Sequence, residues 1–335
     1  MPPSLIHAEV PTIARSSWSS KTIRIAVAVA LTAVIVWRTD PSAVLAATSN
    51  ARVSWLMAAV LLVLLDRSLM AYRWIVLVRV FEAADRVSLS ALLRVFFVST
   101  FVGTFLPTSV GADAVRAYGL ARGHSTAARS VASVLMDRLL GVLSLLLVAL
   151  VGLAFAGDLL HESAVLAGIA LTAITCAAGA SAIYSERVAA VAARLLGVIP
   201  LAAVRRVAVN LTTAVRTYAP RHGTVAVVLA GSIAVQMIRI VQAYTLGLAL
   251  DLRLPFTTYV AFVPIVLLVM LLPITVFGLG TSQLAFAALF ARAGVPAGPA
   301  VALSLLFVGL GVVGNLPGAF LYATGGGRHP KEAAG

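Results

Sequence analysis

Charged residues are scarce in this chain, and acidic residues are the scarcest of them. Of its 335 residues only 11% are charged, 12 being Asp or Glu and 25 Lys or Arg, whereas 61% are hydrophobic. Soluble domains carry about 25% charged and about 45–50% apolar residues, and the mean hydropathy here is +1.03. The composition excludes a chain built of soluble domains and predicts an all-α integral membrane protein.

Cysteine and histidine are too few and too scattered for a disulfide framework or a metal site. The single cysteine, Cys176, excludes an intramolecular disulfide. The five histidines fall in predicted loops or tails, without the spacing of metal ligands: His7, His124, His161, His222 and His329. Catalytic motifs such as G-x-S-x-G, H-E-x-x-H and the Walker A lysine are also missing. We therefore expect no cofactor, no metal and no enzymatic activity.

The formal net charge of +13 comes almost entirely from arginine. Basic residues collect in cytoplasmic loops, next to anionic lipid headgroups. No basic patch in the sequence carries the interleaved aromatic residues that would favour nucleic acid. The charge therefore predicts a membrane topology and membrane-lipid partners, not nucleic acid binding.

Long apolar runs predict about six full spanning helices, since a helix needs about 20 apolar residues to cross the hydrocarbon core. These runs lie at 22–38, 53–78, 139–157, 163–184, 224–250 and 299–323. The first run also resembles a signal peptide, but Arg38 and Asp40 lie where a cleavage region is neutral. We interpret 22–323 as one transmembrane domain between tails at 1–21 and 324–335.

Two further apolar stretches, 88–106 and 256–272, each run into a Leu-Pro pair followed by glycine. The residues of these interruptions are Pro107 and Gly111 in FLPTSVG, and Pro273, Gly278 and Gly280 in LLPITVFGLG. Proline removes a backbone donor and glycine permits a tight reversal. Backbone groups freed in this way must be buried or line a wet cavity. We therefore expect re-entrant elements at about 88–120 and 256–293.

Charge bias gives the two interrupted stretches opposite orientations. Arginines mark both flanks of 88–120 as cytoplasmic: Arg73, Arg79, Arg86, Arg122 and Arg129. The N-terminal segment, the loop 185–223 with its six arginines and the C-terminal tail also lie inside by this rule, which places Arg292 outside. Opposed broken helices are typical of an inverted repeat. The alternative is two kinked spanning helices that only pack together.

Charged residues follow the first interruption at helical spacing. Asp113 and Arg116 are three apart and share a helix face, and Asp137 and Arg138 open the next span. A helix N-terminus beside Arg116 suits an anion such as a phosphate headgroup. The spacing is compatible with an Asp113–Arg116 pair, and equally with Asp137–Arg116 or Asp113–Arg138 bridges.

Other polar residues interrupt the predicted spans. A stripe at three-residue steps must face the protein interior; it consists of Gln236, Arg239 and Gln242. Asp66 is compatible with a functional cavity or with snorkelling at the cytoplasmic end of its helix. Arg73 and Trp74 are expected to be interface anchors. Gly314 and Gly318 form a G-x-x-x-G step, which predicts close helix packing.

These motifs together resemble the flippase-like transmembrane domain of lysylphosphatidylglycerol synthases over about residues 22–323. The resemblance rests on the Arg73–Trp74 pair and on three segments: LPTSVGADAVR at 106–116, ASVLMDR at 132–138, and LPITVFGLGTSQ at 272–283 with the ARAGVP turn after it. It implies translocation of a lipid between leaflets. Phospholipids, polyprenyl-phosphate-linked sugars and hopanoid-type lipids are all open as substrates.

The sequence departs from the family pattern at the second motif. Family members usually carry an acidic residue after the first glycine, and Asp113 supplies it. They carry glutamate where Gln283 stands here, which puts a proton-linked or cation-linked role of that carboxylate in doubt. The 335 residues include no soluble synthase domain, so aminoacylation of lipid is not implied.

The sequence thus predicts a multi-pass lipid flippase or transporter of the inner cell membrane, with both termini cytoplasmic. Its substrate would be an anionic phospholipid or a lipid-linked sugar, and a homo-oligomer is left open. The expected substrate-binding residues are Pro107, Gly111, Asp113, Arg116, Asp137, Arg138, Arg239, Pro273, Gly278, Gly280 and Gln283. The alternatives are a membrane enzyme or accessory subunit for polyprenyl-phosphate-linked sugars, with Asp113 or Asp137 as base, and ion-coupled solute transport.

Overall fold

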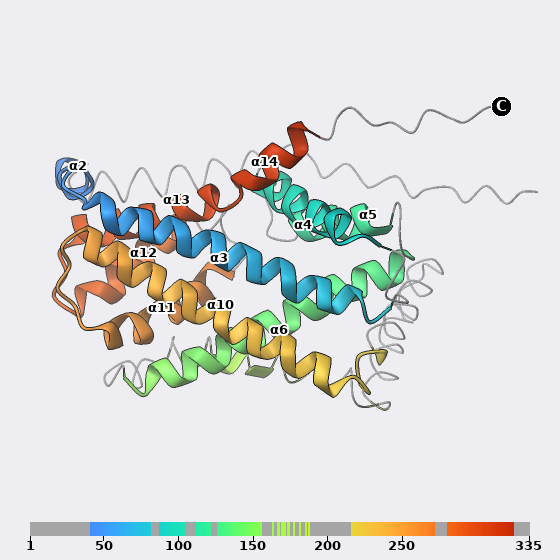
Figure 1. Ribbon diagram of the computed structural model, residues 1–335. Helices are drawn as coiled ribbons and strands as arrows, with labels where there is room; N and C mark the ends of the chain where they lie inside the picture. The colour runs from blue at the N-terminus through green and yellow to red at the C-terminus, as the bar shows by residue number, and fades with distance from the viewer. Residues whose placement is uncertain are drawn as a thin grey trace, which may run out of the picture.

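The computed structural model describes residues 41–81, 87–104, 111–121, 126–155, 216–271 and 280–324, with scattered positions between 163 and 187. The regular elements of these residues are helices packed into an elongated bundle (Figure 1). Helices are expected here, because a helix satisfies its own backbone donors and acceptors in an apolar environment. The first of them, α2 (Pro41–Ser49), is a short helix that leads into the bundle.

Within the described residues, four helical segments are long and apolar enough to cross a membrane. They are α3 (Val53–Val78), α6 (Ala127–Leu153), α10 (His222–Ala249), and α13 (Ala297–Val313) together with α14 (Leu316–Ala323). Helices α3 and α10 confirm the spans predicted at 53–78 and 224–250. The predicted span at 22–38 lies outside the described residues, and the one at 163–184 is described only at scattered positions.

The other two predicted spans differ from the structure at their boundaries. Helix α6 begins at Ala127, well before the predicted 139, because Thr126 caps its N-terminus by accepting a hydrogen bond from the Arg129 N–H. The predicted span 299–323 is interrupted between α13 and α14. Pro317 lies in the first turn of α14, where a missing backbone donor costs little.

Helices α4 (Leu89–Thr104) and α5 (Gly111–Ala121) form an antiparallel pair, which we call the first hairpin. Gly103 near the end of α4 lies against Ala112 at the start of α5. Gly119 near the end of α5 lies against Val95 of α4. The two helices therefore run in opposite directions; residues 105–110, which include Pro107, lie outside the described residues.

Helices α11 (Phe256–Leu271) and α12 (Thr281–Ala291) form the second hairpin. Tyr259 and Phe262 near the start of α11 contact the ring of Phe290 near the end of α12, with ring centroids 5.4 and 5.5 Å apart. The two helices are therefore antiparallel as well. Their connection, 272–279, includes Pro273 and Gly278 and lies outside the described residues.

The order and the lengths of the helices repeat along the chain. Helices α3, α4, α5 and α6 have 26, 16, 11 and 27 residues. Helices α10, α11 and α12 have 28, 16 and 11, and α13 with α14 spans 27. A 16-residue helix is about 24 Å long, which is less than the roughly 30 Å hydrocarbon core. The four hairpin helices are thus too short to cross a membrane singly.

Corresponding helices of the two halves, α3 and α10, lie side by side and antiparallel (Figure 1). The Arg52 N–H donates to the Ala249 carbonyl at one end of the pair. At the other end, the Tyr218 hydroxyl donates to the Leu77 carbonyl at 2.9 Å. Because each hairpin follows the C-terminal end of its long helix, the two hairpins begin at opposite ends of this pair.

Each half of the bundle ends against the hairpin of the other half. Gly152 near the end of α6 lies against the Val260 carbonyl of α11, and Gly318 of α14 lies against the Phe97 carbonyl of α4. Gly314 lies against Val63 of α3, so both glycines of the G-x-x-x-G step confirm the predicted close packing. Backbones approach this closely only where a side chain is missing.

Both the outer surface and the core of the bundle are apolar. Large hydrophobic side chains are exposed on several helices, among them Leu61 and Leu65 of α3, Leu150 of α6 and Phe320 of α14. The core of the second half contains a chain of aromatic contacts through α10, α11, α12 and α13. An apolar outer surface of this extent is typical of a protein surrounded by lipid.

Candidate functional site

The buried face of α3 contains charged residues at helical spacing. Asp66 and Arg73 are seven residues apart, so they lie two turns apart on one face, and they are only 1% and 3% exposed. Trp74 is 0% exposed. The prediction that Arg73 and Trp74 are interface anchors is therefore wrong, because their face of α3 packs inside the protein. Asp66 does not snorkel to the surface either.

Asp137 of α6 joins three helices through its carboxylate. Arg73 of α3 donates from Nη2 to Asp137 Oδ1 at 2.7 Å, and also approaches the Asp137 backbone carbonyl at 3.3 Å. Arg116 of α5 lies with Nη1 at 3.6 Å from Asp137 Oδ2. The carboxylate thus serves as the shared counter-ion of two buried arginines, one of which belongs to the first hairpin.

Arg116 is a buried cation of this site whose polar contacts are long. It is 4% exposed, and its guanidinium lies over the rings of Phe96 and Trp74, at 4.4 and 5.5 Å from their centroids. A guanidinium has five N–H donors. Among the described residues its polar contacts are two long ones, to Asp137 and from Nε to Ser99 Oγ at 3.4 Å. The group therefore retains unused capacity to bind an anion.

Asp113 lies in the first turn of α5, where a carboxylate interacts favourably with the helix dipole. It accepts a hydrogen bond from Nε of Arg138 of α6 at 2.5 Å. The structure therefore contains both cross-helix bridges that the spacing allowed, Arg116–Asp137 and Arg138–Asp113. Arg138 remains 42% exposed, so this end of the site is accessible from outside the bundle.

A second group of charges surrounds Asp66. Arg239 of α10 donates to Asp66 Oδ1 at 3.1 Å, and Arg67 donates to Asp66 Oδ2 at 3.0 Å. Arg67 also donates to Asn315 Oδ1, and the Asn315 amide donates to Thr104 at the end of α4. The break between α13 and α14 is thus connected by hydrogen bonds to the end of α4 and to the charges of α3.

These two groups form what we call the ion-pair network. Its members are Asp66, Arg67, Arg73, Asp113, Arg116, Asp137, Arg138 and Arg239. Asp66 and Arg239 lie within electrostatic reach of Arg73, which links the two groups. Among the residues that the structure describes, five arginines face three aspartates, so the formal charges of these eight side chains sum to +2.

The second hairpin presents no comparable charge at its corresponding position. Gln283 is the third residue of α12, as Asp113 is the third of α5. Its Oε1 accepts hydrogen bonds from the Gly280 N–H and from the Ser282 hydroxyl. Gly280 has φ of 86°, in the left-handed region that favours glycine. Buried Gln283 Nε2 has no hydrogen-bond partner among the described residues.

The polar stripe of α10 faces the interior, as predicted. Gln236 donates from Nε2 to the Gly141 carbonyl at 3.3 Å and to Ser144 Oγ at 3.4 Å, which makes it a contact between α10 and α6. Gln242 is also buried. Arg239 differs from both because it belongs to the ion-pair network.

The structure brings together most of the predicted charged site residues. Asp113, Arg116, Asp137 and Arg138 meet at one place, and Arg239 lies in the neighbouring group. Gly111 begins α5, and Gly280 and Gln283 lie in the second hairpin, while Pro107, Pro273 and Gly278 lie outside the described residues. Sequence reasoning missed a role for Arg67, Arg73, Ser99, Thr104 and Asn315. The seven-residue spacing of Asp66 and Arg73, which places both on one face of a helix, could have indicated that Arg73 is buried beside Asp66.

The site is ionic and shows no metal-ligand set: within the described ranges no three or more His, Cys, Asp or Glu side chains gather. The model of the family described as "Lysylphosphatidylglycerol synthase TM region" matches residues 22–318. No curated protein and no solved structure matches the chain significantly. The matched range contains both hairpins and the whole ion-pair network. The chain therefore belongs to the family of the lysylphosphatidylglycerol synthase transmembrane region.

Proposed function

We propose that the protein moves an anionic or lipid-linked substrate between the leaflets of the inner cell membrane, with a phosphate-bearing headgroup bound at Arg116. The observation that carries the proposal is the incomplete pairing of this buried arginine beside the N-terminal turn of α5. Charges inside a membrane are costly and face partners, cavities or pathways. An anionic headgroup would supply the short charged contacts that Arg116 lacks among the described residues.

The geometry suits a headgroup that contains a phosphate more than one without a phosphate. Arginine binds phosphate through two parallel N–H donors, and free amides at a helix N-terminus add donors of the same kind. The Arg116–Asp137 contact of 3.6 Å is the longest pairing in the network. A phosphate would replace this weak contact, and Asp137 would keep its stronger bond to Arg73 at 2.7 Å.

Alternating access is supported by the arrangement of the two halves. The corresponding long helices α3 and α10 are antiparallel, and each half ends against the other half's hairpin. In an inverted repeat, small rocking of one half against the other opens a central site to alternate sides. By charge bias, the first hairpin enters from the cytoplasm and the second from outside, with both termini cytoplasmic.

The observed ion pairs argue against the alternative of a membrane enzyme with Asp113 or Asp137 as base. Each carboxylate accepts a hydrogen bond from an arginine through one oxygen, Oδ2 of Asp113 and Oδ1 of Asp137, and is held beside that cation. A general base must instead reach the proton that it abstracts. We therefore assign both aspartates the role of counter-ions that hold the arginines in place.

Transport is tested with the purified protein in liposomes that contain headgroup-labelled lipids and a membrane-impermeant quencher. The panel includes phosphatidylglycerol, a polyprenyl phosphate and the zwitterionic phosphatidylcholine. We expect the protein to expose an anionic lipid of the inner leaflet faster than empty vesicles do, and Arg116→Gln to abolish this gain. Movement of no anionic lipid above the empty-vesicle rate would contradict the proposal.

A further inference from the structure

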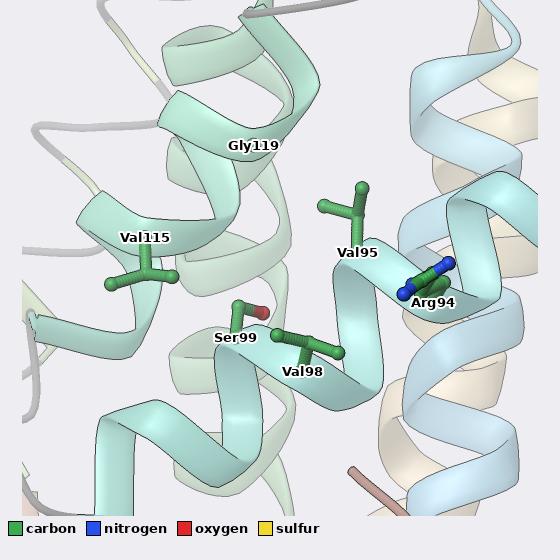
Figure 2. Close-up of a pocket in the computed structure, with 6 residues that line it drawn as sticks. All are labelled: Arg94, Val95, Val98, Ser99, Val115 and Gly119. Carbon is green, nitrogen blue, oxygen red and sulfur yellow. The ribbon is translucent and has the colours of Figure 1, made fainter. Parts of the chain in front are cut away.

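A hollow of about 190 Å³ lies between the two helices of the first hairpin. We call it the α4–α5 hollow; it is lined by Arg94, Val95, Val98, Ser99, Val115 and Gly119. Figure 2 shows four of these residues on α4 and two on α5. Its apolar part is formed by three valines and a glycine, so water gains few hydrogen bonds there.

The lining residues follow helical spacing on both sides. On α4, Arg94 stacks above Val98 and Val95 above Ser99, and on α5, Val115 is followed by Gly119 one turn later. Gly119 keeps the hollow open at its end, because a Cβ there would lie 3.3 Å from Val95 Cγ1. The result is an apolar strip about one turn long between two helices, partly open to the outside of the bundle.

Cations lie at both ends of this strip. Arg94 is exposed at the start, and its Nη2 makes a long contact of 3.5 Å with the Leu321 carbonyl. Ser99 lies at the deeper end and accepts from Nε of Arg116. Ser99 is five positions after Arg94 in α4, a rise of about 7.5 Å along the helix. The strip therefore leads from an exposed cation toward the buried one.

We propose that the α4–α5 hollow binds one hydrocarbon chain of an anionic phospholipid whose phosphate lies at Arg94, one step before the headgroup site at Arg116. The hollow is smaller than the roughly 300–1,000 Å³ of pockets that enclose a whole drug-sized ligand. It therefore suits a stretch of a single chain. The surrounding leaflet supplies phospholipid to a hollow that opens outward, and the two arginines favour a negative headgroup. This step rests on the proposed function only in naming Arg116 as the next site.

The direct test is photocrosslinking of the wild-type protein in nanodiscs, with the crosslinked peptides identified by mass spectrometry. The probes are phosphatidylglycerol and diacylglycerol that carry the same photoreactive acyl chain, and a photoreactive polyprenyl phosphate. We expect phosphatidylglycerol to label peptides of α4 and α5 at the hollow, and diacylglycerol to label them much less. Labelling that maps elsewhere, that is equal for the two acyl probes, or that occurs with the polyprenyl phosphate alone would overturn the proposal.

Two variants test the chain and the phosphate separately. Val115→Trp fills the hollow and should lower phosphatidylglycerol crosslinks there by about tenfold, the loss expected when two methylene groups lose their site. The matched control, Ala114→Trp, adds the same bulk at the neighbouring exposed position and should leave the crosslinks unchanged. Arg94→Gln should reduce the preference for phosphatidylglycerol over diacylglycerol. Equal loss in Val115→Trp and Ala114→Trp would overturn the proposal.

Failure of this proposal is distinguishable from failure of the proposed function. If the wild-type protein transports lipid but its hollow is not labelled, the hollow is not a lipid site and the function stands. If the hollow is labelled by phosphatidylglycerol and no transport occurs in liposomes, the lipid site is supported and the function fails. The wild-type crosslinking map decides the lipid site even if Val115→Trp does not fold.

Discussion

At the scale of single residues, Asp137 determines whether two arginines can be buried at all. Arg73 and Arg116 contact its two different oxygens, and both side chains are almost fully enclosed. Such a shared counter-ion is needed because an arginine in an apolar interior cannot lose its charge. Apolar residues of similar volume are often at least as stable at buried ion-pair positions, so we propose that these charges serve substrate binding rather than stability.

Replacing Asp137 by Asn should destabilise the protein strongly. The change leaves two buried arginines without their counter-ion, and breaking a buried pair costs about 3–5 kcal/mol. Equilibrium unfolding in mixed detergent micelles measures the effect. The matched control is Asp251→Asn, which removes an exposed ion pair with Arg52 and should change the unfolding free energy by less than about 1 kcal/mol. Equal effects of both substitutions would show that Asp137 does not act as a buried counter-ion.

Arg116→Lys separates charge from geometry at the proposed headgroup site. Lysine keeps the positive charge, but it loses the planar group that lies over Phe96 and Trp74 and the paired donors that fit a phosphate. We expect the liposome transport rate to fall by about tenfold or more, the equivalent of one lost bidentate contact. Arg253→Lys, at a side chain that is 88% exposed, is the control. A rate equal to the wild type would show that charge alone suffices at this position.

At the scale of helices, the sequence predicts where the long apolar helices lie. It predicts less well where each helix ends and which of its faces is buried. Helices α3 and α10 lie where the apolar runs are, because hydropathy and helix length depend on the same residues. The start of α6 and the break after α13 depend on Thr126 and Asn315, whose hydrogen bonds hydropathy does not register. These are local polar contacts inside generally apolar segments.

The face of a helix depends on its neighbours, which composition does not reveal. An Arg-Trp pair near a helix end has the same local pattern whether it faces headgroups or the protein interior. Here α4 and α6 pack over it and bury both side chains. The Arg116–Asp137 and Arg138–Asp113 bridges were within reach of sequence reasoning because two short motifs contain all four residues. Which of the possible pairs form depends on how α5 packs against α6, and the sequence does not show this.

Gly152 and Gly318, through which each half packs against the hairpin of the other half, should not tolerate even a methyl group. A Cβ at Gly152 or Gly318 would overlap a backbone carbonyl of α11 or α4, and backbone cannot move aside as a flexible side chain can. We expect Gly152→Ala and Gly318→Ala each to lower the unfolding free energy by about 1–3 kcal/mol. Gly309→Ala in α13, where the space around the Cβ position is open, should instead be neutral or stabilising by about 0.5–1 kcal/mol. The same micelle unfolding assay compares the three variants. If all three were tolerated, the packing of each half against the hairpin of the other half would be contradicted.

At the scale of the whole molecule, the two halves are alike in architecture and different in chemistry. The helices repeat in order and length, yet the third residue of α5 is Asp113 and the third of α12 is Gln283. The charge network lies around the first hairpin, whereas the second hairpin packs among aromatic rings. This difference in charge is why we propose the headgroup site for the first half only, with the second half as its neutral counterpart.

The antiparallel pairing of α3 and α10 predicts that the two hairpins begin on opposite sides of the membrane. Arg253 precedes α11 at the end of the pair where Arg52 contacts Asp251, whereas Ser88 precedes α4 at the other end, where Arg221 also lies. In a background with the only cysteine removed, Cys176→Ser, Arg253→Cys and Arg52→Cys should react with a membrane-impermeant maleimide in intact cells. Ser88→Cys and Arg221→Cys should react only after the membrane is permeabilised. Labelling of Ser88→Cys and Arg253→Cys from the same side would contradict the proposed inverted repeat, and with it the proposed alternating access.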